Sequence, residues 1–152
     1  MSEHLVFMMG NFEAQFPTDR QYAKNHMWAQ PTGDSVYRFG FTAYAVRLLQ
    51  DVYFLEWNID EGSQLAERQP IGMIESKKAE SELYAPMAGR LIRLNAQLLR
   101  DPSAINTDKY GEGWLFEMEG EGAPLISPSD YLAHLDAVWE VTQRTIKGQL
   151  NE

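Results

Sequence analysis

The chain contains no cysteine among its 152 residues. It therefore has no disulfide framework, no thiolate metal site and no cysteine nucleophile. Any sulfur redox chemistry must come from an attached group. Histidine is scarce as well, because His4, His26 and His134 are the only three and lie far apart in the sequence. Their spacing matches no metal-binding motif, so we expect no metal site.

Basic residues are few: 13 lysines and arginines stand against 22 aspartates and glutamates, a formal net charge of −9. Nucleic acid and anionic membranes bind basic surfaces, so we expect neither partner. No apolar run approaches the length needed to span a bilayer. The run from Leu5 to Met9 is too short for a signal peptide, and Glu3 rather than a basic cluster precedes it. These features predict a soluble, cytoplasmic protein with length for one domain.

The most informative segment runs from residue 70 to residue 89. An apolar run, Pro70 to Ile74, is followed by the lysine pair Lys77 and Lys78. Apolar side chains then recur at every second position, as in a half-buried strand: Leu83, Ala85 and Met87. The pattern predicts a β-hairpin whose tip carries a lysine amine into water, where it is open to covalent acylation. By itself, an exposed lysine pair between glutamates is usually only a solvated turn.

A second turn is predicted directly after this hairpin, over residues 85–89. Pro86 presets its own φ angle, and Gly89 can adopt the left-handed conformation that a Cβ atom disfavours. We expect this turn to lie across the sheet from the lysine turn.

Several motifs occur together in one order. They are Tyr22 to Trp28, Gly40-Phe41-Thr42, Glu75-Ser76-Lys77-Lys78-Ala79, Leu83-Tyr84-Ala85-Pro86 with Gly89, Asp101-Pro102, and Tyr110 to Leu115. Together they resemble the glycine cleavage H protein family over roughly residues 20 to 120. The lysine motif is the most specific part, since a glutamate three residues before the lysine and a glycine eleven residues after it mark the family.

The resemblance implies a carrier that is not itself an enzyme, with lipoic acid amide-linked to Lys78. Glu75 and Gly89 are implied as recognition features for the lipoate ligase or lipoyl transferase. The implied fold is mainly β with a C-terminal helix, the barrel-sandwich hybrid of lipoyl and biotinyl domains; periodicity alone indicates only an antiparallel β domain. The implied organisation is an N-terminal extension (1–20), a lipoyl-type β domain (21–122) and a C-terminal helical segment (123–152).

Local patterns predict the remaining elements. Residues 1–20 are too apolar for an idle tail, and we expect them to pack on the domain surface, with partner docking as the alternative. Strands are expected at 22–28, 36–41, 52–57 and 114–118, with turns at 31–34 and 60–63. Helices are expected at 43–50 after an N-cap Thr42, at 95–99, and after Ser127-Pro128. The apolar stripe of the last helix should pack it onto the sheet: Leu135, Val138, Trp139, Thr142, Ile146 and Leu150.

Three departures from the family pattern bear on the partner. Met27 replaces a glutamate, Ala43-Tyr44 replaces two polar residues, and Lys77 replaces a small apolar residue. Because they alter the surface near the arm, they slightly favour a lipoate-binding carrier of heterodisulfide-reductase-like sulfur oxidation, whose arm carries sulfur. They predict poor docking to the glycine decarboxylase.

The close alternative is the glycine cleavage carrier. Its arm receives an aminomethyl group from the decarboxylase and then visits the tetrahydrofolate-dependent aminomethyltransferase and dihydrolipoamide dehydrogenase. Two further classes stay open. A biotinyl carrier shares the fold but prefers methionines beside its lysine, where this chain has Lys77 and Ala79. An unmodified binding scaffold would show no lipoyl mass increment.

Overall fold

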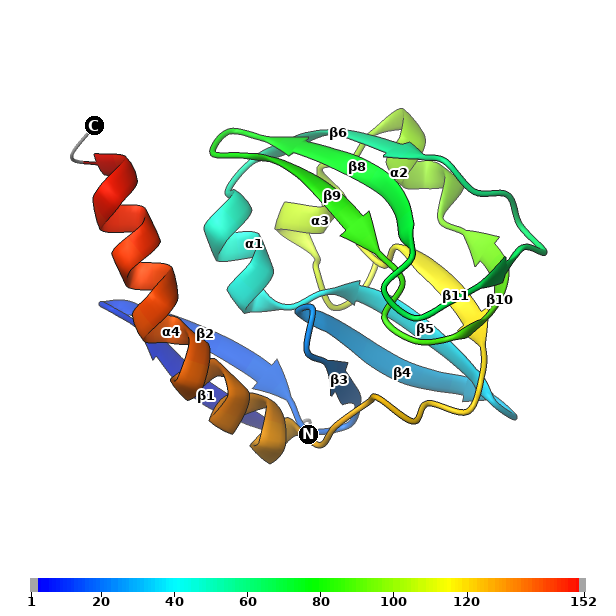
Figure 1. The fold of residues 1–152 in the computed structure, drawn as a ribbon, viewed down its shortest axis with the longest axis horizontal. Helices are drawn as coiled ribbons and strands as arrows, with labels where there is room; N and C mark the ends of the chain where they lie inside the picture. Colours follow the sequence, from blue (N-terminus) through cyan, green and yellow to red (C-terminus); the bar gives the residue numbers. More distant parts are fainter. Residues whose placement is uncertain (1–2, 151–152) are drawn as a thin grey trace.

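The computed structural model describes residues 3–150, with side chains through Thr142. Two antiparallel sheets face each other at the centre of the molecule (Figure 1). The larger sheet has the strand order β3 (Gln21–Ala23), β4 (Met27–Gly33), β5 (Val36–Phe41), β11 (Phe116–Glu119), β10 (Gly89–Leu94) and β7 (Gln64–Leu65). The smaller has the order β6 (Val52–Trp57), β8 (Pro70–Ser76) and β9 (Glu80–Tyr84).

The main core fills the space between these sheets. Phe39 and Phe116 are fully buried on the larger sheet, and Ile71 and Ile74 on the smaller. Each such side chain contributes about 1.5–3 kcal/mol through its removal from water. The short helices α2 (Ala96–Arg100) and α3 (Ala104–Thr107) add Leu98 and Ile105 to this core. The arrangement confirms the predicted class, a mainly β barrel-sandwich with a C-terminal helix.

Residues 22–28, predicted as one extended segment, form two strands. The chain turns between β3 and β4, and His26 adopts a positive φ of 71° there. The next turn also differs from the prediction, because β4 continues through Pro31 to Gly33 and the chain reverses at Asp34-Ser35. Proline is tolerated within β4 because the neighbouring β3 pairs only as far as Ala29, which leaves one edge of β4 open at that point. The closing strand β11 begins at Phe116, two residues later than predicted.

The N-terminal segment forms a hairpin of its own, β1 (His4–Met9) paired with β2 (Phe12–Pro17). Gly10 takes a positive φ of 65° in the short connection, a conformation that favours glycine. One face of the hairpin is buried against the domain: Phe7, Met9, Ala14 and Phe16. This confirms the expected packing on the domain surface for the described part of the segment, from Glu3 on.

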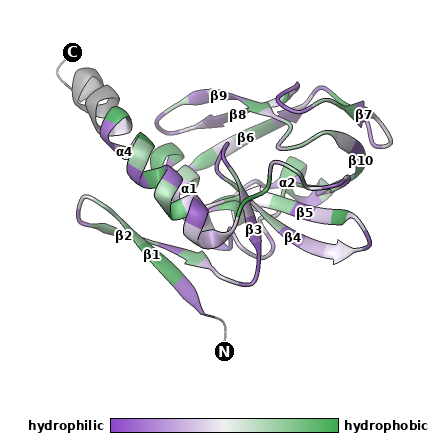
Figure 2. Ribbon diagram, turned by 60° about the horizontal axis from the view of Figure 1, so that its bottom comes forward, coloured by the Kyte–Doolittle hydropathy of each residue, from purple (hydrophilic) through white to green (hydrophobic). Residues whose placement is uncertain are grey.

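The last helix, α4 (Pro128–Leu150), begins as predicted. The Ser127 hydroxyl oxygen accepts the N–H of Asp130 at 3.1 Å. Its buried residues Tyr131 and Leu135, with partly buried Trp139, pack on the β1–β2 hairpin, on α1 (Ala43–Leu49) and on β3 at the edge of the larger sheet, where Tyr131 stacks on Tyr22. The predicted packing on the sheet therefore holds at β3 and extends to the hairpin and α1. Figures 1 and 2 both place α4 beside this hairpin. The predicted stripe residues Ile146 and Leu150 lie outside the described side chains.

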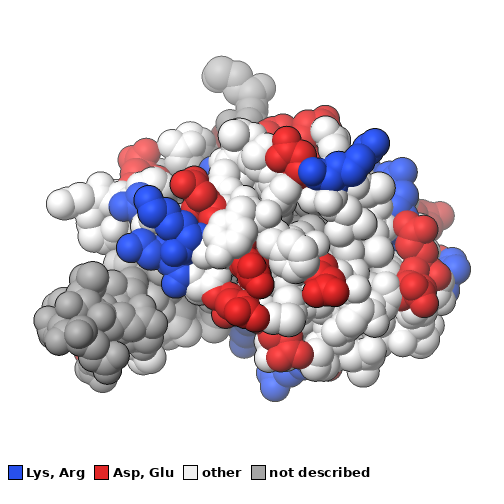
Figure 3. Space-filling model, turned by 90° about the horizontal axis from the view of Figure 1, so that it is seen from above, with Lys and Arg blue, Asp and Glu red and all other residues white. Residues whose placement is uncertain are grey.

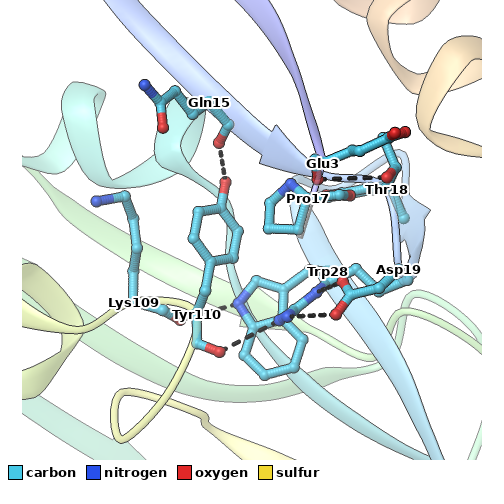
Figure 4. A network of polar contacts seen from close by, with 10 residues as sticks. Glu3, Gln15, Pro17, Thr18, Asp19, Trp28, Lys109 and Tyr110 are labelled. Carbon is cyan, nitrogen blue, oxygen red and sulfur yellow. Dashed lines mark hydrogen bonds and ion pairs between the residues drawn. The ribbon is translucent and has the colours of Figure 1, made fainter. Parts of the chain in front are cut away.

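Polar contacts fasten the N-terminal hairpin to the domain (Figure 4). The Tyr110 hydroxyl donates to the carbonyl oxygen of Gln15 at 2.6 Å and accepts the N–H of Ala43 at 2.9 Å. The Trp28 indole N–H donates to the carbonyl oxygen of Lys109 at 2.9 Å. Tyr110 therefore links β2 to the first residue of α1.

None of the helices within residues 3–150 is long and apolar enough to cross a membrane.

Candidate functional site

Strands β8 and β9 form the predicted lysine hairpin. Ile74 lies opposite Ser81, and Glu75 lies opposite Glu80 in the last pair before the turn. Ser76 closes the turn, because its hydroxyl donates to the carbonyl oxygen of Ala79 at 3.0 Å and accepts the Ala79 N–H at 3.1 Å. A backbone bond of 2.8 Å from Ser76 N–H to the same carbonyl completes it. Serine favours such local side-chain bonds in turns, so the tip has a defined shape.

The two lysines occupy different positions in this turn. The backbone N–H of Lys77 donates to the carbonyl oxygen of Asp51 at 2.8 Å, which fastens the tip to the segment before β6. Lys78 follows it in the turn between Ser76 and Ala79, and both lysine side chains are exposed. Within the described part of the chain neither ammonium group forms an ion pair. The Lys78 amine is therefore open to acylation, and the turn fits a group held by an amide bond.

Glutamates border the tip. Glu75 is partly buried and Glu80 is exposed directly opposite it. Like charges placed opposite each other across two strands lower the stability of a hairpin. Folding alone therefore does not favour this pair, which makes it a candidate for recognition by an enzyme that acts on the lysine.

Gly89 lies at the other end of β9 from the lysine tip. It is the first residue of β10 and pairs with Leu65 in the larger sheet, so it follows the bends at residues 86–88 and does not lie within the predicted turn. Its φ of 157° lies in the positive range that favours glycine, as the sequence predicted. A Cβ atom at this position would collide with the carbonyl oxygen of Glu119. Glycine is needed there for close approach of two backbones. The length of β9 puts the residue on the order of 17 Å from the tip.

The start of α1 is interior, contrary to the prediction of an altered surface. Thr42 caps the helix as expected, with its hydroxyl oxygen accepting the Ala45 N–H at 3.4 Å. Ala43 and Tyr44 are only 3% and 1% exposed, because the β1–β2 hairpin and α4 cover them. Ala45 is half-buried. Tyr44 packs edge-on against Phe7 and Trp139, and its hydroxyl lies 2.8 Å from that of Thr142.

Met27, the other replacement near the arm, is also buried, with 1% of its surface exposed. The substitutions at positions 27, 43 and 44 thus belong to apolar packing. Met27 belongs to the main core, whereas Ala43 and Tyr44 are covered by side chains from the two ends of the chain, which sequence reasoning did not relate to them.

The structure brings together two histidines that the sequence did not relate. The His26 and His134 rings stack with centroids 5.9 Å apart, and His26 Nδ1 lies 2.8 Å from the Tyr131 hydroxyl. Burial, and secondarily the nearby His134, lowers the pKa of His26 from 6.5 to about 4. No group of three or more potential metal ligands occurs in the described residues.

A lipoyl-type β domain that presents an unpaired lysine on a rigid hairpin tip is built as a carrier of an acyl-linked group. Comparisons with known proteins identify the family of carriers to which the chain belongs. The family model described as "Glycine cleavage H-protein" matches residues 20–138. The glycine cleavage system H protein of Mycolicibacterium vanbaalenii is 38% identical over 129 residues, covering 80% of this chain and 98% of that protein. That of Laribacter hongkongensis is 38% identical over 124 residues, covering 82% and 93%.

A solved structure agrees with the sequence comparisons. The crystal structure of a glycine cleavage system H protein from Mycobacterium marinum superposes with a TM-score of 0.66 at 32% identity. It covers 78% of this chain and 97% of that one. The chain belongs to the glycine cleavage H-protein family. Its members are lipoyl carriers, not enzymes, with lipoic acid attached to a lysine. The family match begins at residue 20, so the β1–β2 hairpin lies outside it.

Proposed function

We propose that this chain is the lipoyl carrier of a glycine cleavage system and that Lys78 is the attachment residue. The observation that carries the proposal is the hairpin tip, which holds the exposed Lys78 amine without an ion pair to any described residue, while the backbone of neighbouring Lys77 is bonded to Asp51. When attached, the lipoyl group supplies the disulfide chemistry that accepts an aminomethyl unit and is later reoxidised. The chain supplies attachment, orientation and partner recognition.

The hairpin residues have separate roles in this proposal. Ser76 holds the turn, so that Lys78 is presented in one conformation to the ligase or transferase. Glu75 and Glu80 form an acidic border that a basic enzyme surface recognises. Gly89 contributes from a distance, by permitting the backbone approach that holds β10 and the segment after β9 in place.

The buried positions of Met27, Ala43 and Tyr44 support glycine cleavage over sulfur oxidation. The sulfur-oxidation hypothesis requires that these residues remove polar groups from an exposed docking surface. In the structure Met27 lies in the main core and Ala43 and Tyr44 lie in the cluster beneath the N-terminal hairpin and α4, so only exposed Lys77 alters the surface. The named relatives are glycine cleavage H proteins and lend the heterodisulfide-reductase hypothesis no support. The proposed partners are the decarboxylase, the aminomethyltransferase and dihydrolipoamide dehydrogenase.

Lipoylation in vitro tests the attachment site. The protein is incubated with lipoate, ATP and a lipoate ligase, and its intact mass and proteolytic peptides are measured. We expect one lipoyl group on Lys78, none in Lys78→Arg, and nearly full modification in the matched control Lys77→Arg. A lipoyl group mapped to Lys77, or an unmodified wild-type protein, would overturn the assignment.

A further inference from the structure

Two consecutive aromatic residues are exposed on β6. Tyr53 is 62% exposed and Phe54 is 43% exposed. Neighbouring residues of a regular strand point to opposite faces, so one of the two would ordinarily be buried. Here the register against β8 shifts between Val52 and Phe54, which makes Tyr53 an extra residue of a β-bulge. The bulge turns both side chains outward.

This aromatic pair lies beside the lysine tip. Val52 is opposite Ser76, Phe54 is opposite Glu75, and the Lys77 N–H is bonded to the carbonyl oxygen of Asp51. The aromatic residues therefore begin two positions after the residue that anchors the tip. Two strand residues span about 7 Å, which an extended lysine side chain bearing an acyl chain exceeds.

We propose that Tyr53 and Phe54 form a resting site for the lipoyl arm of Lys78, which deepens the proposed function and rests on it. The occupant is an apolar acyl chain that ends in a cyclic disulfide. Its methylene groups leave water by lying on the two rings, and its sulfur atoms make favourable contacts with the ring edges. Figure 3 looks down on the side of the molecule where β6 and β8 lie, and uncharged surface there is bordered by acidic groups.

Charge explains why the site fills after modification. The unmodified Lys78 carries an ammonium group, and acidic Glu75 and Glu80 border the tip and attract it. Amide formation removes that charge, and only the apolar contact with the rings remains. Within the described residues β6 pairs with β8 alone; on its other edge no strand is added, and the Val52 N–H donates to the side-chain oxygen of Asn106 at 2.9 Å. A resting arm covers an apolar edge that would otherwise favour association with other strands.

The rate at which the arm is reduced tests this site. Lipoylated protein, verified by intact mass, is treated with a water-soluble phosphine and the appearance of thiols is followed. Sulfur–aromatic contacts protect the disulfide, so we expect the Tyr53→Ser/Phe54→Ser double variant to react about two- to tenfold faster than wild type. The matched control Tyr84→Ser removes another exposed ring of the same sheet, at the far end of β9, and is expected to react like wild type.

Aromatic NMR resonances provide a second readout on the unaltered site. Lipoylation is expected to shift the ring signals of Tyr53 and Phe54 but not that of Tyr84, and the Lys78→Arg protein treated alike is expected to show no shift. Lack of a lipoyl mass increment would overturn the proposed function itself. A lipoylated protein with unchanged ring signals, and equal reduction rates in wild type and double variant, would overturn the resting site alone and leave the rings to partner docking.

Discussion

The Lys77 N–H and the carbonyl oxygen of Asp51 form a hydrogen bond of 2.8 Å that joins the hairpin tip to the segment before β6. With Ser76 closing the other side of the turn, this bond gives the two adjacent lysines unequal freedom. The backbone of Lys77 is bonded to Asp51, whereas Lys78 follows within the turn with an exposed side chain. A carrier needs this combination, because a ligase must find one lysine and the arm must then move from a fixed base.

Ser76→Ala should loosen the tip. The substitution removes the two hydroxyl hydrogen bonds to Ala79, and we expect the free energy of unfolding to fall by about 1–2 kcal/mol. The initial rate of lipoylation should fall with it. Ser81→Ala, on the exposed start of β9, is the matched control and should change neither quantity. Chemical denaturation measures the stability and intact-mass time courses measure the lipoylation rate. Equal lipoylation rates in the two variants would show that the Ser76 hydroxyl bonds are not needed for modification.

Gly89→Ala should destabilise the domain although it adds a single methyl group. The new Cβ would meet the Glu119 carbonyl oxygen, and separating the two backbones is expected to cost about 1–3 kcal/mol. Gly33→Ala is the control, because a Cβ there has open space around it. Thermal melts of both variants decide the point. Wild-type stability in Gly89→Ala would contradict the close approach of the two strands.

The sequence predicts the lysine hairpin and the start of α4 because both depend on neighbouring residues. Alternating apolar residues around Lys78 define the hairpin, and Ser127-Pro128 with an acidic residue defines the helix start. The close backbone contact at Gly89 could not be predicted from neighbouring residues, since it is made with Glu119, a residue of another strand. Burial of Tyr44 could not be predicted either, because it depends on β1 and α4, which reach α1 only in the folded chain.

The N-terminal hairpin should stabilise the fold without serving the attachment site. Phe7 is 8% exposed and contacts Tyr44 and Trp139. We expect Phe7→Ala to lower the free energy of unfolding by about 3 kcal/mol. Val6→Ala, on the exposed face of the same strand, should change it by less than about 0.5 kcal/mol. Lipoylation of Lys78 should persist in both variants below their melting temperatures, and its loss in folded Phe7→Ala would link the hairpin to the ligase.

Stability should depend on His26 at mildly acidic pH. Burial lowers the pKa of His26 to about 4 from 6.5, so the unfolded chain binds a proton that the folded chain does not between these values. The folded state is therefore fully favoured above about pH 6.5 and loses stability as the pH falls toward 4. The loss is on the order of 2–3 kcal/mol. His26→Gln should flatten this part of the denaturation profile. An equally steep profile in His26→Gln would place the acid sensitivity elsewhere.

Glycine–bicarbonate exchange tests the central claim most directly. Lipoylated wild-type protein is mixed with a conventional glycine decarboxylase, and the exchange of labelled bicarbonate into glycine is compared with that supported by a conventional H protein at equal concentration. The account predicts comparable turnover for wild type and for Lys77→Arg, and none for Lys78→Arg. If wild-type protein with verified lipoylation gives an exchange rate no higher than the assay without any H protein, the assignment to glycine cleavage is contradicted.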